Sequence, residues 1–162
     1  MESSSNSKIA SLSPLLEAMS GVLTSSVNST RISGSYLLSA VLEAFRKPSC
    51  NLTFYSRDGE LLSEFLVARL DDIQCISPMI SALSSLLYIK FEGGGWLPPS
   101  AVADIARATC VKIEPQAHAR ETRSLIMECF IALLSNPTYV SIVGNMYVLF
   151  NIICMGNNTL LI

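Results

Sequence analysis

Residues 76–87 read ISPMISALSSLL, and this stretch has the clearest hydrophobic period in the chain. Its large apolar side chains recur every three or four residues, and serines fill most of the positions between them. This spacing predicts an α-helix with an apolar face and an opposite serine face. The apolar residues are Ile76, Met79, Ile80, Leu83, Leu86 and Leu87, and the serines are Ser77, Ser81, Ser84 and Ser85. Three glycines, residues 93–95, end the run.

The preceding segment predicts another helix that opens near residues 58–60, because an acidic residue favours the positive end of the helix dipole. Its wide apolar face comprises Leu61, Leu62, Phe65, Leu66 and Leu70. Glu60, Glu64 and Asp71 fall together on its solvent side. A tight corner follows at Asp71 and Asp72, and Asp72 is expected to cap the helix over 76–87.

Two more helices are expected on the N-terminal side of this pair. Ile9, Leu12, Leu16, Met19 and Leu23 recur at helical spacing, and Ser13 followed by Pro14 suits the N-cap and first turn. A polar cluster over 24–30 predicts a loop. The next helix contains the apolar residues Ile32, Tyr36, Val41, Leu42 and Phe45. It should end near residues 46–48, since proline cannot continue a helix.

Two helices are also expected on the C-terminal side. One starts at Pro98 and Pro99, with Val102, Ile105, Ala106 and Ile113 inside and Asp104, Arg107 and Lys112 outside. The other starts after Pro115 and ends at residues 136–137. Its buried stripe comprises Leu125, Ile126, Cys129, Phe130, Leu133 and Leu134. No segment sustains the alternation expected of a strand.

Six amphipathic helices with short connections predict an all-α fold of three antiparallel pairs. The expected pair starts, near residues 8, 58 and 98, are separated by 50 and 40 residues, close to the roughly 40–47 of HEAT and armadillo repeats. Each pair needs a neighbour to bury its apolar stripe, which favours a HEAT/armadillo-like α-solenoid fragment. A closed bundle would satisfy the same stripes. The expected division is a disordered polar N-terminus over 1–7 and a HEAT-like helical domain over 8–136.

Residues 137–162 form an uncharged, apolar tail, and three interpretations stay open. It could be a seventh helix packed on the sixth, or an aberrant extension such as translated intron. It could also be a membrane anchor, because the apolar run from Tyr139 to Met155 approaches the roughly 20 residues that span a bilayer. Asn145 and Asn151 inside the run, and the lack of flanking Lys or Arg, disfavour the anchor.

The composition excludes several classes of protein. Half of the residues are hydrophobic and 15% are charged, which excludes a disordered chain. The net charge is −2 and no basic stripe is present, so direct nucleic-acid binding is not expected. The five cysteines are scattered, with no CxxC pair to start a metal site, which favours a reducing compartment. The N-terminus lacks the charged-then-apolar pattern of a secretory signal.

No catalytic, cofactor-binding or metal-binding residue can be assigned, so a non-enzymatic protein is predicted. Gly93, Gly94 and Gly95 lack the Gly-Lys-Ser/Thr continuation of a phosphate loop and predict a connector. His118 is the only histidine, and no marked nucleophile accompanies it. Cys110 and Cys129 are expected to pack in the core. Trp96 lies between glycines and prolines and suggests a partner contact, although it could also cover the end of the helix over 76–87.

Three segments together resemble a known family. They are LLSEFLVARLDDIQCISPMISALSSLL over 61–87, LPPSAVADIARATCVKI over 97–113 and RETRSLIMECFIALLS over 120–135. This order is similar to the N-terminal region of the MMS nineteen family, the large HEAT-repeat subunit of the cytosolic iron–sulfur protein assembly targeting complex. The likeness is best over about 58–135 and ends after Pro137.

The resemblance implies a scaffold that passes iron–sulfur clusters to apo-proteins of DNA repair, replication and transcription, in cytoplasm and nucleus. The implied partners are the other targeting subunits and apo-clients such as helicases and polymerases. Family members hold no cluster through a dedicated cysteine motif, so no cofactor is implied and no functional residue is carried over. The alternative is a small helical membrane protein anchored by the C-terminal apolar segment.

Overall fold

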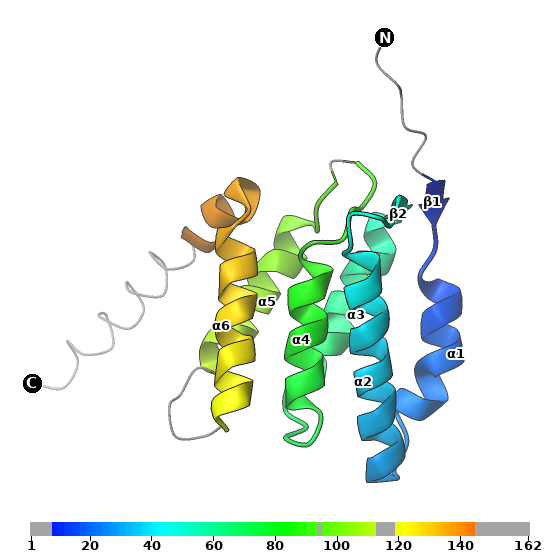
Figure 1. Cartoon of the computed structure of the whole chain (residues 1–162). Coiled ribbons are helices and arrows are strands. Elements are labelled where there is room, and N and C mark those ends of the chain that lie inside the picture. The colour runs from blue at the N-terminus through cyan, green and yellow to red at the C-terminus, as the bar shows by residue number, and fades with distance from the viewer. Residues whose placement is uncertain (1–7, 94, 113–118, 145–162) are drawn as a thin grey trace, which may run out of the picture.

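The computed structural model describes residues 8–93, 95–112 and 119–144, and it confirms three stacked antiparallel helix pairs (Figure 1). The first pair is α1 (Ser13–Leu23) and α2 (Asn28–Phe45). The second is α3 (Ser56–Ala68) and α4 (Ile76–Leu86), and the third is α5 (Pro99–Val111) and α6 (Arg120–Leu134). The predicted all-α, solenoid-like fold is therefore correct.

The pairs stack in two layers, and the helices of one layer pack against each other more extensively than those of the other. Helices α2, α4 and α6 lie side by side, with α4 in the middle (Figure 1). Helices α1, α3 and α5 form the other layer, where α3 and α5 pack against each other less extensively than α4 packs against α2 or α6. The second layer is therefore the more open one.

The pairs repeat more regularly than the sequence predicted. They begin at Ser13, Ser56 and Pro99, so each start follows the previous one by 43 residues, instead of the expected 50 and 40. This value falls inside the HEAT range of roughly 40–47. Core positions repeat with the same period. The buried residues related in this way are Met19, Leu62 and Ile105, and then Leu23, Leu66 and Thr109.

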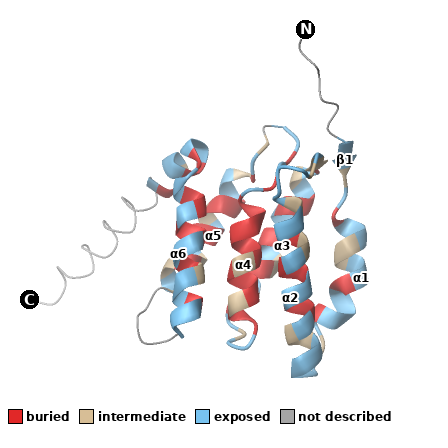
Figure 2. Ribbon diagram, in the orientation of Figure 1, coloured by how far each residue is buried: buried red, intermediate tan, exposed pale blue. Residues whose placement is uncertain are grey.

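Helix α4 is enclosed on nearly all sides, which corrects its predicted serine face. Ser84 and Ser85 are buried, and Ser77 and Ser81 are partly buried. The Ser77 and Thr122 hydroxyl oxygens lie 2.8 Å apart, within hydrogen-bond distance across to α6. Most of the α4 ribbon is accordingly in the buried colour in Figure 2. Because α2 and α6 flank α4, its serines pack between helices and do not face solvent.

Two short strands, which the sequence did not predict, align the connectors at one end of the stack. Strand β1 (Lys8–Ala10) pairs in parallel with β2 (Leu52–Phe54). The Phe54 N–H donates to the Lys90 carbonyl, and the Glu92 N–H donates to the Phe54 carbonyl, each at 2.9 Å. Ile9 is thus an exposed strand residue and not part of the apolar face of α1. Strands of three residues are too short to show a period.

Asp58 joins the first two pairs at the same end. It is buried, and its carboxylate accepts hydrogen bonds from the Leu12 N–H at 2.6 Å, the Ser11 hydroxyl at 2.8 Å and the Ser13 hydroxyl at 3.1 Å. Ser13 is the first residue of α1, so it does not serve as the N-cap that was expected. A carboxylate from α3 binds the start of α1 in its place.

Three other predicted features differ locally from the structure. Helix α2 begins inside the expected loop, at Asn28. Asp72 accepts from the Gln74 N–H at 3.2 Å but makes no side-chain cap on α4, which follows Cys75. Leu61 and Leu134 are 49% and 59% exposed, although they were assigned to apolar stripes. The hydrophobic period of a sequence shows which side of a helix is apolar, but it does not show which edge of that apolar side another helix covers.

A short helix, Pro137–Gly144, follows α6 and is bent from it by 106°. Tyr139 and Val143 of this helix are buried in the core. Among the described residues, no single helix is long and apolar enough to cross a bilayer, and α6 passes that test only when joined to this bent partner. The polar start over 1–7 and most of the Tyr139–Met155 run lie outside the described residues, so the domain division stays a prediction.

Gly59 is a glycine that packing requires, and we expect its replacement to destabilise the protein. A Cβ at Gly59 would lie 2.6 Å from Phe91 Cε1 and 2.9 Å from Leu97 Cδ2, both in buried side chains. Gly59→Ala should therefore lower the free energy of unfolding by about 1–3 kcal/mol, although alanine is the better helix former.

Gly21 is the matched control, because a Cβ there meets nothing within 4 Å. Gly21→Ala should raise the free energy of unfolding by about 0.5–1 kcal/mol. Urea unfolding followed by circular dichroism measures both variants. Changes of the same sign would contradict the predicted close packing at Gly59.

Candidate protein-interaction surface

A groove of about 680 Å³ runs between α3 and α5, in the more open layer of the stack. Small side chains line much of it, namely Ser63, Ala68, Ser100, Ala101 and Ala108. Because these residues do not fill the space between the helices, the groove can accept long side chains from a partner. We call this surface the α3–α5 groove.

The charges in the α3–α5 groove are mainly acidic. Its lining contains the acids Glu60, Glu64, Asp71 and Asp104 and the bases Arg107 and Lys112. Arg107 pairs with Asp104 at 2.6 Å, and Lys112 pairs with Asp71 at 2.7 Å. Both bases are thus already occupied by acids of the groove. Within the described residues Glu60 and Glu64 have no ion-pair partner, and they lie one turn apart on α3.

Glu60 and Glu64 are exposed on α3 as predicted, whereas the exposed Asp71 lies past the end of this helix at Ala68. All three residues nevertheless line the groove. The sequence did not indicate that residues of α5 would lie opposite them. Lys112 reaches Asp71 across 41 residues of chain, a contact that helical periodicity cannot predict. The groove therefore emerges only when consecutive pairs are stacked.

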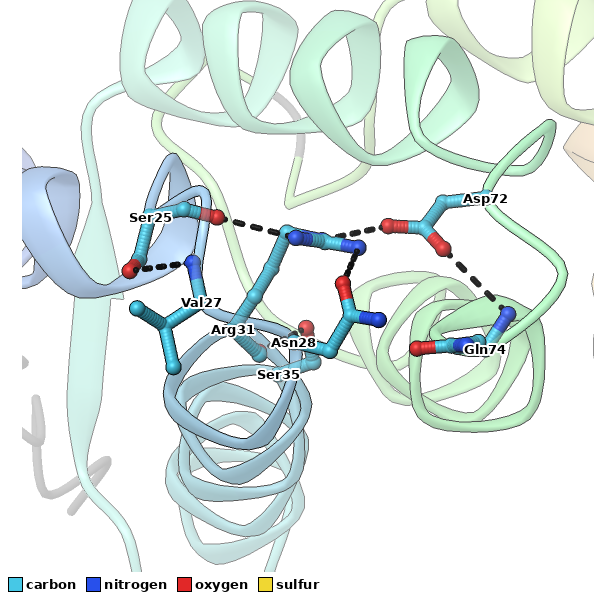
Figure 3. Close-up of polar contacts among 7 residues, drawn as sticks. All are labelled: Ser25, Val27, Asn28, Arg31, Ser35, Asp72 and Gln74. Atoms are coloured by element: carbon cyan, nitrogen blue, oxygen red, sulfur yellow. Dashed lines mark hydrogen bonds and ion pairs between the residues drawn. The ribbon is translucent and has the colours of Figure 1, made fainter.

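The corner beside the groove is fixed by an ion pair to the first helix pair (Figure 3). Arg31 of α2 donates from Nε to Asp72 at 2.6 Å, from Nη1 to the Ser25 carbonyl at 2.9 Å and from Nη2 to Asn28 Oδ1 at 2.9 Å. The hydrogen bond from Arg31 lowers the pKa of Asp72, and the hydrogen bond to Asp72 raises the pKa of Arg31. This contact holds the corner that carries the neighbouring Asp71 into the groove.

Trp96 packs within the protein, although part of it is exposed. Its ring lies edge-on to Tyr139, with centroids 6.0 Å apart, and 44% of the residue is accessible. The Leu97 N–H donates to the Tyr139 hydroxyl at 3.1 Å. Trp96 therefore packs against the helix that follows α6. Gly93 and Gly95 have φ values of 77° and 81°, a backbone conformation that favours glycine in this connector.

The described cysteines are core or partly buried residues. Cys129 is fully buried, and desolvation raises the pKa of its thiol to about 11, so the thiol stays protonated near neutral pH. This supports the predicted packing role of Cys129, and Cys110 is partly buried against the core. Among the described residues no three His, Cys, Asp or Glu side chains are grouped to hold a metal ion. His118 and Cys154 lie outside those residues.

The stacked pairs and their open, charged groove define a helical-repeat protein of the scaffold type, which presents side chains to other proteins. The chain belongs to the MMS nineteen N-terminal family, because the family model described as "Dos2-interacting transcription regulator of RNA-Pol-II" matches residues 16–156. The match continues past Pro137, where the resemblance was expected to end. Comparisons with curated proteins and with solved structures find no match.

Proposed function

We propose that this chain is a non-enzymatic scaffold in the delivery of iron–sulfur clusters to apo-proteins of DNA repair, replication and transcription, in cytoplasm and nucleus. Membership of the MMS nineteen N-terminal family supports this proposal. The stacked helix pairs support it too, since such repeats bind partners through extended surfaces and need no bond chemistry. The partners would be the targeting subunits and apo-clients such as helicases and polymerases.

The observation that carries the proposal is a pair of acids in the α3–α5 groove that form no ion pair with any residue in the described part of the chain. Glu60 and Glu64 are exposed on α3, while both bases in the lining already pair with Asp104 and Asp71. A basic segment of a partner would therefore meet free carboxylates, and its long aliphatic stems would pack on the small residues of the groove. Such charge complementarity sets partner choice and association rate.

We expect the double substitution Glu60→Lys and Glu64→Lys to reduce capture of the targeting subunits or client helicases by about tenfold or more. Like charges placed across an interface cost several kcal/mol, and each 1.4 kcal/mol is tenfold in affinity. The measurement is an affinity pull-down with the purified chain as bait. Circular dichroism should remain unchanged, because both positions are exposed.

The matched control is Glu17→Lys with Glu43→Lys, which makes the same change in net charge at exposed sites on α1 and α2, outside the groove. This control should retain capture. If both double variants bind equally well, the groove is not the docking surface. If the unaltered chain captures neither class of partner, the proposed function is lost and only the fold remains.

A further inference from the structure

An accessible serine lies where the start of α1 is attached to α3. Ser13 is the exposed first residue of α1, and Pro14 follows it. The Ser13 hydroxyl donates to Asp58 Oδ1 at 3.1 Å. Asp58 is only 6% exposed, and its other oxygen accepts the Leu12 N–H at 2.6 Å and the Ser11 hydroxyl at 2.8 Å. An exposed residue thus holds its hydroxyl against a buried carboxylate.

Two serines of the chain are followed by proline, namely Ser13 and Ser77. Proline-directed protein kinases act on such pairs, since proline presents no N–H at the following position. Ser77 is only partly exposed, and its hydroxyl is 2.8 Å from that of Thr122 on α6. Its neighbour Pro78 is buried within α4. Of the two serines, Ser13 is therefore the one that a kinase can reach in the folded chain.

We propose that Ser13 is a phosphorylation site and that its phosphate detaches the start of α1 from α3. A proline-directed kinase transfers the γ-phosphoryl group of ATP to the Ser13 Oγ. A P–O bond forms there while the bond to ADP breaks, and the hydroxyl proton leaves to a base of the kinase. The phosphoserine carries a charge of about −1.5 to −2 at neutral pH, and its ester oxygen has no proton to donate. Repulsion between two anions then replaces the hydrogen bond to Asp58.

The segment that must open for the kinase is short. A kinase binds its substrate in an extended conformation, so the first turn of α1 has to unwind. Pro14 has no N–H, and unwinding therefore breaks no hydrogen bond at that residue. Opening at Ser77 would instead separate α4 from α6, which lie in the more tightly packed layer. Opening a short segment at the edge of a fold requires less free energy than opening its core.

Two opposing electrostatic effects act on a phosphate at Ser13. The positive end of the α1 dipole attracts the phosphate, because Ser13 is in the first turn. The Asp58 carboxylate repels it, and this repulsion is strong because burial shields the carboxylate from water. The attraction acts within α1, whereas the repulsion acts between α1 and α3. Helix α1 should therefore stay folded but be attached less firmly to α3.

The test treats the full-length chain with ATP and a purified mitogen-activated protein kinase, and peptide mass spectrometry locates the phosphate. Ser13 should be phosphorylated at least about tenfold faster than Ser77, because only Ser77 requires the core to open. Synthetic peptides of residues 8–19 and 72–83 should both be phosphorylated. The Leu12 N–H then reports how firmly α1 is attached. Its hydrogen exchange, measured by NMR, should be about tenfold faster or more after phosphorylation.

Three variants separate the added charge from the lost hydrogen bond. Ser13→Asp places a negative charge at the same position and should speed exchange of the Leu12 N–H, as phosphate does. Ser13→Ala removes the hydroxyl without adding charge and should have a smaller effect. Asp58→Asn keeps an oxygen that can accept the Leu12 N–H but removes the negative charge. Phosphorylation of this third variant should no longer speed the exchange.

The proposal fails if the folded chain receives no phosphate at Ser13, or as much at Ser77. It also fails if phosphate at Ser13 leaves exchange of the Leu12 N–H unchanged or slows it, which would show that the α1 dipole outweighs the repulsion from Asp58. Equal effects of Ser13→Asp and Ser13→Ala would contradict it too, and this comparison does not require Asp58→Asn to fold. None of these measurements depends on partner capture by the α3–α5 groove.

Discussion

Tyr139→Ala is expected to lower the free energy of unfolding by about 3–5 kcal/mol, the range for removing a buried aromatic ring. Tyr139 is 0% exposed and lies against Trp96, and its hydroxyl accepts the Leu97 N–H at 3.1 Å. The substitution would leave a cavity and an unsatisfied backbone donor in the core. Urea unfolding monitored by circular dichroism measures the loss, since Trp96 fluorescence would itself respond to the missing ring.

A second substitution separates the ring from the hydroxyl, and a third, at the neighbouring residue, is the control. Tyr139→Phe keeps the ring and should cost about 1–3 kcal/mol, because the buried Leu97 N–H would lose its acceptor. Val140→Ala alters the neighbouring residue, which is 41% exposed, and should have only a small effect. If Tyr139→Ala were as mild as Val140→Ala, the helix Pro137–Gly144 would not be part of the core.

Asp58→Ala should also destabilise the protein strongly, by about 2–3 kcal/mol, because it removes buried hydrogen bonds to a charged group. The substitution removes the common acceptor of Ser11, Leu12 and Ser13, and it leaves the buried Leu12 N–H without a partner. It also releases the start of α1 from α3. Thermal and urea unfolding should both report the change.

An exposed aspartate provides the comparison for this prediction. Asp104 forms an ion pair with Arg107 three residues away, and both side chains are more than half exposed. Asp104→Ala should change stability by less than about 0.5 kcal/mol, because exposed pairs contribute little. Equal effects of Asp58→Ala and Asp104→Ala would show that the buried carboxylate does not hold the first two pairs together.

The helices could be predicted from the sequence because their signals are local. A period of 3.6 residues, prolines near helix starts and polar corners all lie within a few residues of the elements that they define. The two strands could not be predicted, because each has three residues and depends on a partner more than 40 residues away. The role of Asp58 was missed for the same reason, since Leu12 is 46 positions earlier.

The acidic residues of the candidate site could be predicted from the sequence, but the groove that they line could not. The spacing of Glu60, Glu64 and Asp71 indicated a shared solvent face, and all three residues line the groove, although Asp71 lies past the end of α3. The groove itself needs α5 beside α3, and the pairing of Lys112 with Asp71 decides which acids remain without ion partners. Amphipathic patterns show which side of a helix is buried but not which helix covers it. The exposed Leu134 and the buried Ser84 and Ser85 are errors of that kind.

The enclosed serines of α4 restrict how this chain can diverge during evolution. Ser84 and Ser85 occupy gaps between neighbouring helices, so only alanine, glycine and residues of similar size could replace them without pushing those helices apart. Exposed positions of α2 and α6 carry no such restriction. Related chains with this stack should therefore keep small residues in the second half of α4, even where their outer surfaces have changed completely.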